Sequence, residues 1–146
     1  VAMGGVSAPA SAKSKGYVFK YKGVSVTMNG AAKKLIKKAG KPSKKTVKKS
    51  CAYKGKDRTY TYKDFQLKTY SKTNNGAEYV SEIRFRSNKA VTKEGIRIGS
   101  SLKDVTKKYG KAKARFGVYT FKKGSSKLQI MLNGNKVSAI RYFASK

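Results

Sequence analysis

Within 146 residues the chain carries 36 Lys and Arg against six Asp and Glu, which gives a formal net charge of +30. The absence of His and the single Cys exclude Ser-His-Asp and Cys-His catalysis, His-ligated zinc and an intrachain disulfide. No stretch is long and apolar enough to form a membrane-spanning helix, and all but six of the cations are lysine, which favours diffuse attraction to polyanions over shaped recognition.

The first 16 residues are predicted to lie outside the folded part of the chain. They are small, apolar and rich in Ala and Ser, and Ala10-Ser11-Ala12 resembles the cleavage site that ends a secretory signal peptide. We therefore expect residues 1–16 to be a signal-peptide remnant and disordered lead, and the protein to be extracellular or associated with a cell wall or envelope. The alternative is an Ala/Ser-rich disordered start with no targeting role.

Residues 17–40 are predicted to form a β-hairpin followed by a helix. Apolar and polar residues alternate on both sides of Gly23, which permits the turn. Asn29 is expected to cap a helix that Gly40 ends. The apolar face of this helix has the spacing i, i+3, i+4, i+7, at Ala32, Leu35, Ile36 and Ala39. Four lysines occupy its solvent face: Lys33, Lys34, Lys37 and Lys38.

Residues 43–58 form the most cationic window of the sequence. Ser43 is expected to begin a short helical turn with Val47 facing inward. Alternating apolar residues then predict strands around Tyr60 and Tyr62, over 65–69 and over 79–86, with a turn at Asn74-Asn75-Gly76 before the last of them.

The second half of the chain follows the same order of elements. Residues 95–98 resemble 23–26, a helix is predicted from Ser101 to Gly110, and alternating strands follow. The closing strand 137–142 (VSAIRY) matches 80–85 (VSEIRF). The sequence therefore predicts two tandem copies of one unit, repeat one over 17–90 and repeat two over 91–146.

A glycine-closed helix followed by antiparallel strands, present twice, resembles the β-lactamase-inhibitor-protein-like (BLIP-like) tandem-repeat fold. The segment 92–101 (TKEGIRIGSS) and Tyr109-Gly110 carry most of this resemblance, and they are also similar to a motif of small outer-membrane assembly lipoproteins. The segment 50–57 (SCAYKGKD) resembles secreted proteins and lipoproteins of Gram-positive bacteria. The resemblance implies an α+β fold in which each repeat packs a short helical segment on an antiparallel sheet of three to four strands.

The few acidic residues and the cysteine do not suggest a reactive centre. Asp57 and Asp64 lie in turn contexts and are interpreted as turn formers. Glu78 and Glu82 share a predicted strand face and are expected to pair with lysines across it. Cys51 is interpreted as a small buried apolar residue, with an intermolecular disulfide as the alternative. We therefore predict no enzyme activity, no cofactor and no metal.

The composition favours a strongly basic binding module that engages an anionic cell-wall polymer, acidic lipid headgroups or an envelope protein rather than a small molecule. The residues expected to carry it are lysines for docking and tyrosines for contact: Lys33, Lys37, Lys44, Lys48, Tyr53, Tyr60, Tyr62 and Tyr70. Two alternatives stay open. One is inhibition of a secreted enzyme through a concave sheet face, and the other is nucleic-acid binding by lysines interleaved with tyrosines. The sequence leaves the oligomeric state open.

Overall fold

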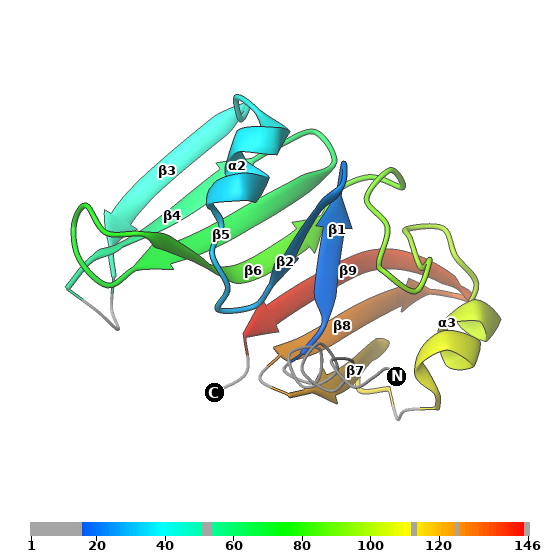
Figure 1. Ribbon diagram of the computed structural model, residues 1–146. Helices are drawn as coiled ribbons and strands as arrows, with labels where there is room; N and C mark the ends of the chain where they lie inside the picture. The colour runs from blue at the N-terminus through cyan, green and yellow to red at the C-terminus, as the bar shows by residue number, and fades with distance from the viewer. Residues whose placement is uncertain (1–15, 51–53, 112–113, 125, 145–146) are drawn as a thin grey trace, which may run out of the picture.

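The computed structural model describes residues 16–50, 54–111, 114–124 and 126–144 (Figure 1). These residues form an α+β fold, as predicted: two short helices, a two-stranded hairpin and a seven-stranded antiparallel sheet. In chain order the elements are β1 (Val18–Tyr21), β2 (Val24–Thr27), α2 (Lys33–Ala39), β3 (Lys44–Lys49), β4 (Lys56–Thr61), β5 (Phe65–Ser71), β6 (Glu78–Phe85), α3 (Leu102–Tyr109), β7 (Val118–Lys123), β8 (Ser126–Asn133) and β9 (Lys136–Ala144).

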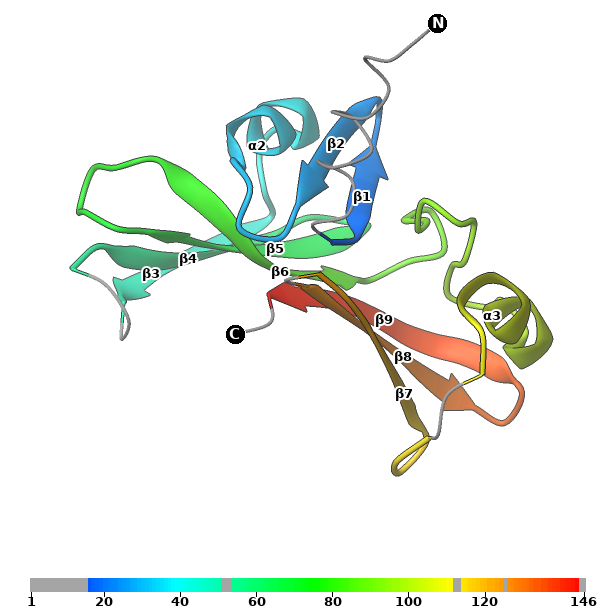
Figure 2. The ribbon, with the colours of Figure 1, turned by 60° about the horizontal axis from the view of Figure 1, so that its bottom comes forward.

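The large sheet joins strands from both halves of the chain. Its order is β3-β4-β5-β6-β9-β8-β7, so that β3 and β7 are the two edge strands and β6 pairs with β9 in the middle. The hairpin β1–β2 and both helices lie on one side of this sheet (Figure 2). The other side carries no helix among the residues that the structure describes, and we call it the open face.

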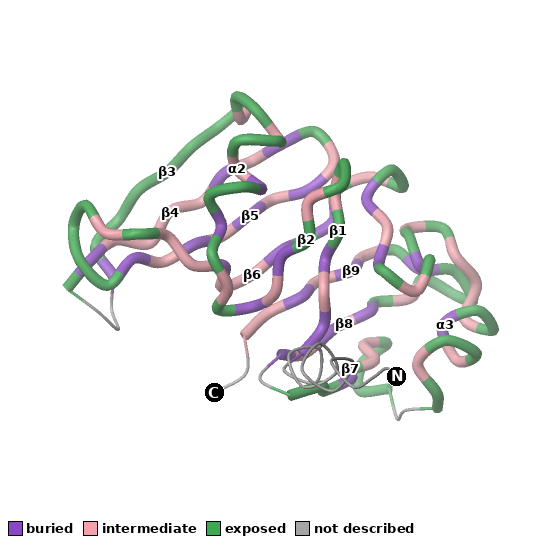
Figure 3. The backbone as a smooth tube through the Cα atoms, viewed as in Figure 1, coloured by how far each residue is buried: buried purple, intermediate pink, exposed green. Residues whose placement is uncertain are grey.

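Strand alternation follows the pattern expected from the sequence. In β5 every second residue is buried, beginning with Phe65 and Leu67, and the residues between them are partly exposed (Figure 3). Period-2 burial arises because successive side chains of a strand point to opposite faces, so one face packs against the hairpin and helices and the other meets solvent.

The registers of the paired strands are interrupted twice. Leu67 lies opposite Ile83 in the β5–β6 pair, and the register shifts between Lys68 and Thr69. In the β8–β9 pair the register shifts between Met131 and Leu132. Each irregularity increases the local twist of its strand pair. In the middle of the sheet Arg84 lies directly opposite Arg141.

The hydrophobic core is shared by both ends of the chain and is centred on Phe19 of β1. The Phe19 side chain is fully buried, and its ring centroid lies 5.4 Å from those of Phe65 and Phe85 and 6.3 Å from that of Tyr142. Leu35 of α2 and Val105 of α3 are also buried in this core. The hairpin thus fixes β5, β6 and β9 against one another by aromatic packing.

The helix ends are confirmed except for one cap. The Ser101 side chain accepts a hydrogen bond from the Asp104 backbone N–H (3.1 Å), and Gly40 and Gly110 end their helices with positive φ angles of 81° and 89°. The predicted Asn29 cap is wrong, because α2 begins four residues later at Lys33 with no side-chain cap. Asn29 has a φ of 65°, in the left-handed region that Asn tolerates in turns.

The predicted helical turn after Ser43 is also wrong. Residues 44–49 form strand β3, and all six pair with β4, from Lys44 opposite Thr61 to Lys49 opposite Lys56. Val47 is 49% exposed rather than inward-facing. The local sequence permits either conformation, and the unpaired edge of β4 supplies the hydrogen bonds that select the strand.

Candidate functional site

The four lysines predicted to dock together lie on different surfaces. Lys33 and Lys37 are exposed on α2. Lys44 and Lys48 are exposed on β3, where strand alternation directs them toward the open face. The alternate residue Lys45 points to the helix side, because its Nζ lies 5.2 Å from the centroid of the buried Tyr60 ring.

Of the predicted contact tyrosines, two are core residues. Tyr60 and Tyr62 are only 4% and 5% exposed, so their rings are not available at the surface. The Tyr60 hydroxyl donates a hydrogen bond to Glu78 (2.7 Å), and burial together with this carboxylate raises the pKa of Tyr60 above its usual range. Tyr70 is half-buried and donates to the Asn29 side chain (2.9 Å). Tyr53, like Cys51, lies outside the described residues.

A strip of lysines on β3 is the first candidate site. All six residues of this edge strand are exposed, and four of them are lysine; we call Lys44, Lys45, Lys48 and Lys49 the lysine edge. At its end a hollow is lined by Lys48, Lys49, Lys54 and Lys56. Asp57, opposite Lys48, is the only acidic residue on the neighbouring strand β4. The lysine edge therefore presents a row of weakly compensated positive charges.

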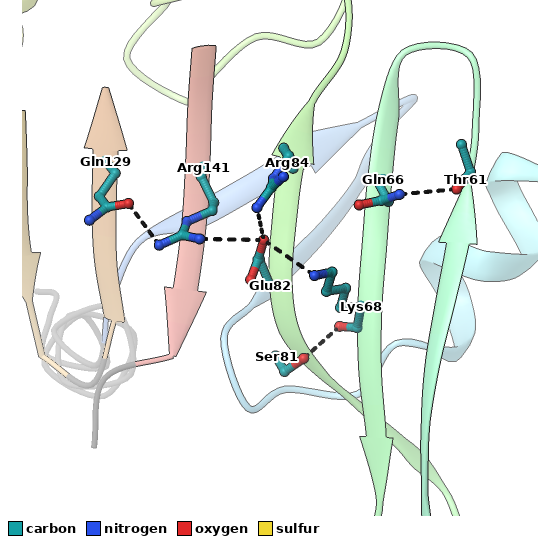
Figure 4. Close-up of polar contacts among 8 residues, drawn as sticks. All are labelled: Thr61, Gln66, Lys68, Ser81, Glu82, Arg84, Gln129 and Arg141. Atoms are coloured by element: carbon teal, nitrogen blue, oxygen red, sulfur yellow. Dashed lines mark hydrogen bonds and ion pairs between the residues drawn. The ribbon is translucent and has the colours of Figure 1, made fainter. Parts of the chain in front are cut away.

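A second candidate lies in the middle of the open face, around Glu82 of β6 (Figure 4). One carboxylate oxygen of Glu82 lies 3.2 Å from Arg84, 3.9 Å from Arg141 and 4.0 Å from Lys68. Arg141 also donates to the Gln129 side chain (2.7 Å). We call these five residues the Glu82 cluster.

The Glu82 cluster forms because the sheet places two arginines in one cross-strand pair. Arg84 and Arg141 are directly opposite, and like charges in that position repel. Glu82 is the partner of both, and its side chain is only 15% exposed. A shallow hollow of about 120 Å³ adjoins the cluster, lined by both arginines, Gln129 and Met131 among others. Guanidinium groups beside an apolar side chain can bind a carboxylate or phosphate.

Sequence reasoning anticipated only part of this cluster. The expected pairing of Glu82 with a lysine across the strand is confirmed for Lys68, whereas Glu78 accepts hydrogen bonds from Tyr60 and Thr69 (both 2.7 Å). The two arginines were missed. The available signal was their shared place in the matching segments 80–85 and 137–142.

We predict that Glu82→Gln destabilises the fold by about 1–2 kcal/mol at low salt, because it leaves three cations without their common partner. The loss should shrink in 1 M NaCl, where charge repulsion is screened within about 3 Å. Thermal or urea unfolding at both salt concentrations measures it. Asp57→Asn changes the net charge equally and serves as the control. Equal, salt-independent losses in the two variants would contradict this account.

Two classes of site are not found in the described part of the chain. No group of three or more His, Cys, Asp or Glu side chains gathers there to hold a metal ion. Of the two helices in the described residues, α2 and α3, neither has the length and apolar character needed to cross a membrane. Comparison of the chain with protein-family models, curated proteins and solved structures gave no match, so the BLIP-like resemblance stays a prediction.

Proposed function

We propose that this protein is a non-enzymatic, extracellular or envelope-associated module that binds anionic polymers. The observation that carries the proposal is the lysine edge, an edge strand whose six residues are all exposed and whose four lysines face both sides of the sheet. An unpaired strand edge with lysines also resists pairing with other chains, so this strip stays accessible.

The spacing of the lysine edge suits a polymer with regularly repeated charges. Alternate residues of a strand lie about 6.6–6.8 Å apart, so Lys44 and Lys48 span roughly 13 Å on one side of β3 and Lys45 and Lys49 span the same length on the other. Lysine ammonium groups act as hydrated point charges that bind phosphates without demanding one geometry. A row of such charges favours a flexible polyanion over a single small ligand.

We further propose that the fold is a BLIP-like tandem repeat. Backbone pairing supports this. The hydrogen bond from Asn29 to Val80 has a counterpart from Gly99 to Val137, and the reverse bond from Val80 to Gly30 has one from Val137 to Ser100. The two register shifts also correspond. One follows Lys68, the residue after Leu67, which lies opposite Ile83, and the other follows Met131, the residue after Ile130, which lies opposite Ile140. A pseudo-twofold axis between Arg84 and Arg141 would relate the two units.

The test is retention of the wild-type protein on beads that carry inorganic polyphosphate, with neutral dextran beads as the control. We expect tight retention in 50 mM NaCl and a linear fall of log affinity with log salt concentration, because bound lysines release counterions. Retention that persists unchanged in 1 M NaCl, or that is equal on neutral beads, would exclude this function.

A second candidate is inhibition of a secreted enzyme through the open face. The observation that favours it is the hollow beside the Glu82 cluster, because Arg and Met are enriched in the centres of protein interfaces. It predicts a stoichiometric complex with one secreted protein that high salt weakens little. Salt dependence of binding therefore separates the two functions.

A further inference from the structure

The turn between Arg115 and Val118 holds an aromatic residue in an unfavourable backbone conformation. Arg115 and Val118 exchange two backbone hydrogen bonds of 3.0 Å each, which closes a tight turn around Phe116 and Gly117. Both central residues have positive φ angles, 55° for Phe116 and 78° for Gly117. Such turns favour Asn, Asp or Gly at both positions, because a side chain with φ above zero meets the backbone.

The Phe116 ring does not offset this conformational cost by packing against the rest of the protein. Its side chain is fully exposed (103%), whereas the next most exposed large apolar side chains among the described residues, Val47 and Met131, reach 49% and 40%. An aromatic side chain normally stabilises a protein by burial, and this one is fully hydrated. A costly conformation that positions an unpacked ring outward is typical of a contact with something outside the chain.

The surroundings of this turn are predominantly basic, with Asp104 as an exposed acidic residue at the start of α3, where Leu102 donates a backbone hydrogen bond to Asn135 of the β8–β9 turn. Residues 105–146 contain eleven Lys and Arg and no Asp or Glu. Arg115 is exposed next to Phe116, and Lys111 is exposed a few residues before it in the sequence. Lys136 is exposed at the neighbouring turn between β8 and β9. The turn projects from the end of edge strand β7 (Figure 2), on the edge of the sheet opposite the lysine edge.

We propose that this turn inserts Phe116 into the interfacial region of an anionic lipid bilayer while Arg115 and the nearby lysines bind the lipid phosphates. A bilayer offers both parts of the chemistry, since aromatic rings settle at the headgroup level and cations are attracted to the surface. A soluble polyanion offers no apolar layer for the ring. This turn adds a second anion-binding surface to the proposed lysine edge, and binding there requires the Phe116 ring as well as positive charge.

The first experiment compares wild type with Phe116→Asn in sedimentation with phosphatidylglycerol vesicles. Asn accepts a positive φ, so this variant should not melt below wild type and a binding loss cannot be attributed to misfolding. We expect vesicle affinity to fall about tenfold, the effect of removing one buried aromatic ring. Retention on polyphosphate beads should be unchanged, because that binding needs charge alone. Wild type should bind phosphatidylcholine vesicles only weakly.

The second experiment uses the absence of Trp from the chain. Phe116→Trp introduces the only Trp of the chain at the turn, which can be excited at a wavelength that tyrosine does not absorb. Its emission should shift to shorter wavelength and be quenched by brominated lipid when phosphatidylglycerol vesicles are added. Asn88→Trp places the same reporter at an exposed, uncharged position after β6, outside both this turn and the lysine edge, and should show neither change.

The outcomes separate this inference from the proposed function. Equal vesicle binding by wild type and Phe116→Asn, or no spectral change for Phe116→Trp, overturns insertion even if polyphosphate binding holds. Loss of polyphosphate binding by wild type, with Phe116-dependent vesicle binding intact, instead removes the proposed function alone. A salt-resistant protein complex that requires Phe116, without vesicle binding, would assign the turn to a protein pocket and overturn the lipid assignment.

Discussion

Phe19→Ala is expected to destabilise the protein by about 3–5 kcal/mol, the range for truncating a fully buried Phe. This is a large share of the roughly 5–15 kcal/mol that stabilises a domain. The ring packs against Phe65, Phe85 and Tyr142, which belong to three different strands of the large sheet. Its removal leaves a cavity between the hairpin and the sheet, and the surrounding aromatics are too rigid to fill it.

Urea unfolding followed by tyrosine fluorescence measures this effect. Phe116→Ala is the matched control, because it deletes the same ring from a fully exposed position with positive φ. We expect the control to change stability by less than about 0.5 kcal/mol. Comparable losses in the two variants would show that the hairpin does not centre the core.

The largest expected effect on binding comes from the lysine edge. Replacing Lys44, Lys45, Lys48 and Lys49 by Gln should weaken retention on polyphosphate at least about a hundredfold. This assumes about 1 kcal/mol for each basic residue near an anionic surface, reduced for incomplete contact. The dependence of log affinity on log salt should become shallower, because fewer counterions are released on binding.

A second variant separates local from global charge. This variant replaces four lysines of α2 by Gln and lowers the net charge by the same amount as the lysine-edge variant; the positions are Lys33, Lys34, Lys37 and Lys38. If the lysine edge is the site, this helix variant keeps most of its affinity, and Arg at the four β3 positions restores binding. Equal losses from the helix and edge variants would mean that net charge alone governs binding.

Local patterns predicted the elements whose residues carry their own signals. Period-2 alternation identified β5, β6, β8 and β9, and the glycines at 40 and 110 ended both helices as expected. These predictions succeeded because backbone sterics and side-chain alternation act within a few residues. The same rules failed at 44–49, because this exposed, lysine-rich segment has no alternation of apolar residues. It forms a strand because it pairs with β4.

The candidate sites were predicted less well than the elements. Tyr60 and Tyr62 alternate equally well as surface or core residues, and only tertiary packing into the shared core, on the half of the sheet where α2 lies, buries them. Glu82 and Arg141 are 59 positions apart in the sequence and meet because β6 pairs with β9. Phe116 looked like any loop residue until its exposure and backbone angle were known.

The sequence by itself determined the charge of this protein, its lack of histidine and the local conformation of most of its segments, because these follow from composition and short-range sterics. Only the tertiary structure decided which lysines share a surface, which aromatics are buried and which cations surround Glu82. Those properties depend on strand order and register, and contacts between distant segments are selected by the free energy of the whole packed core.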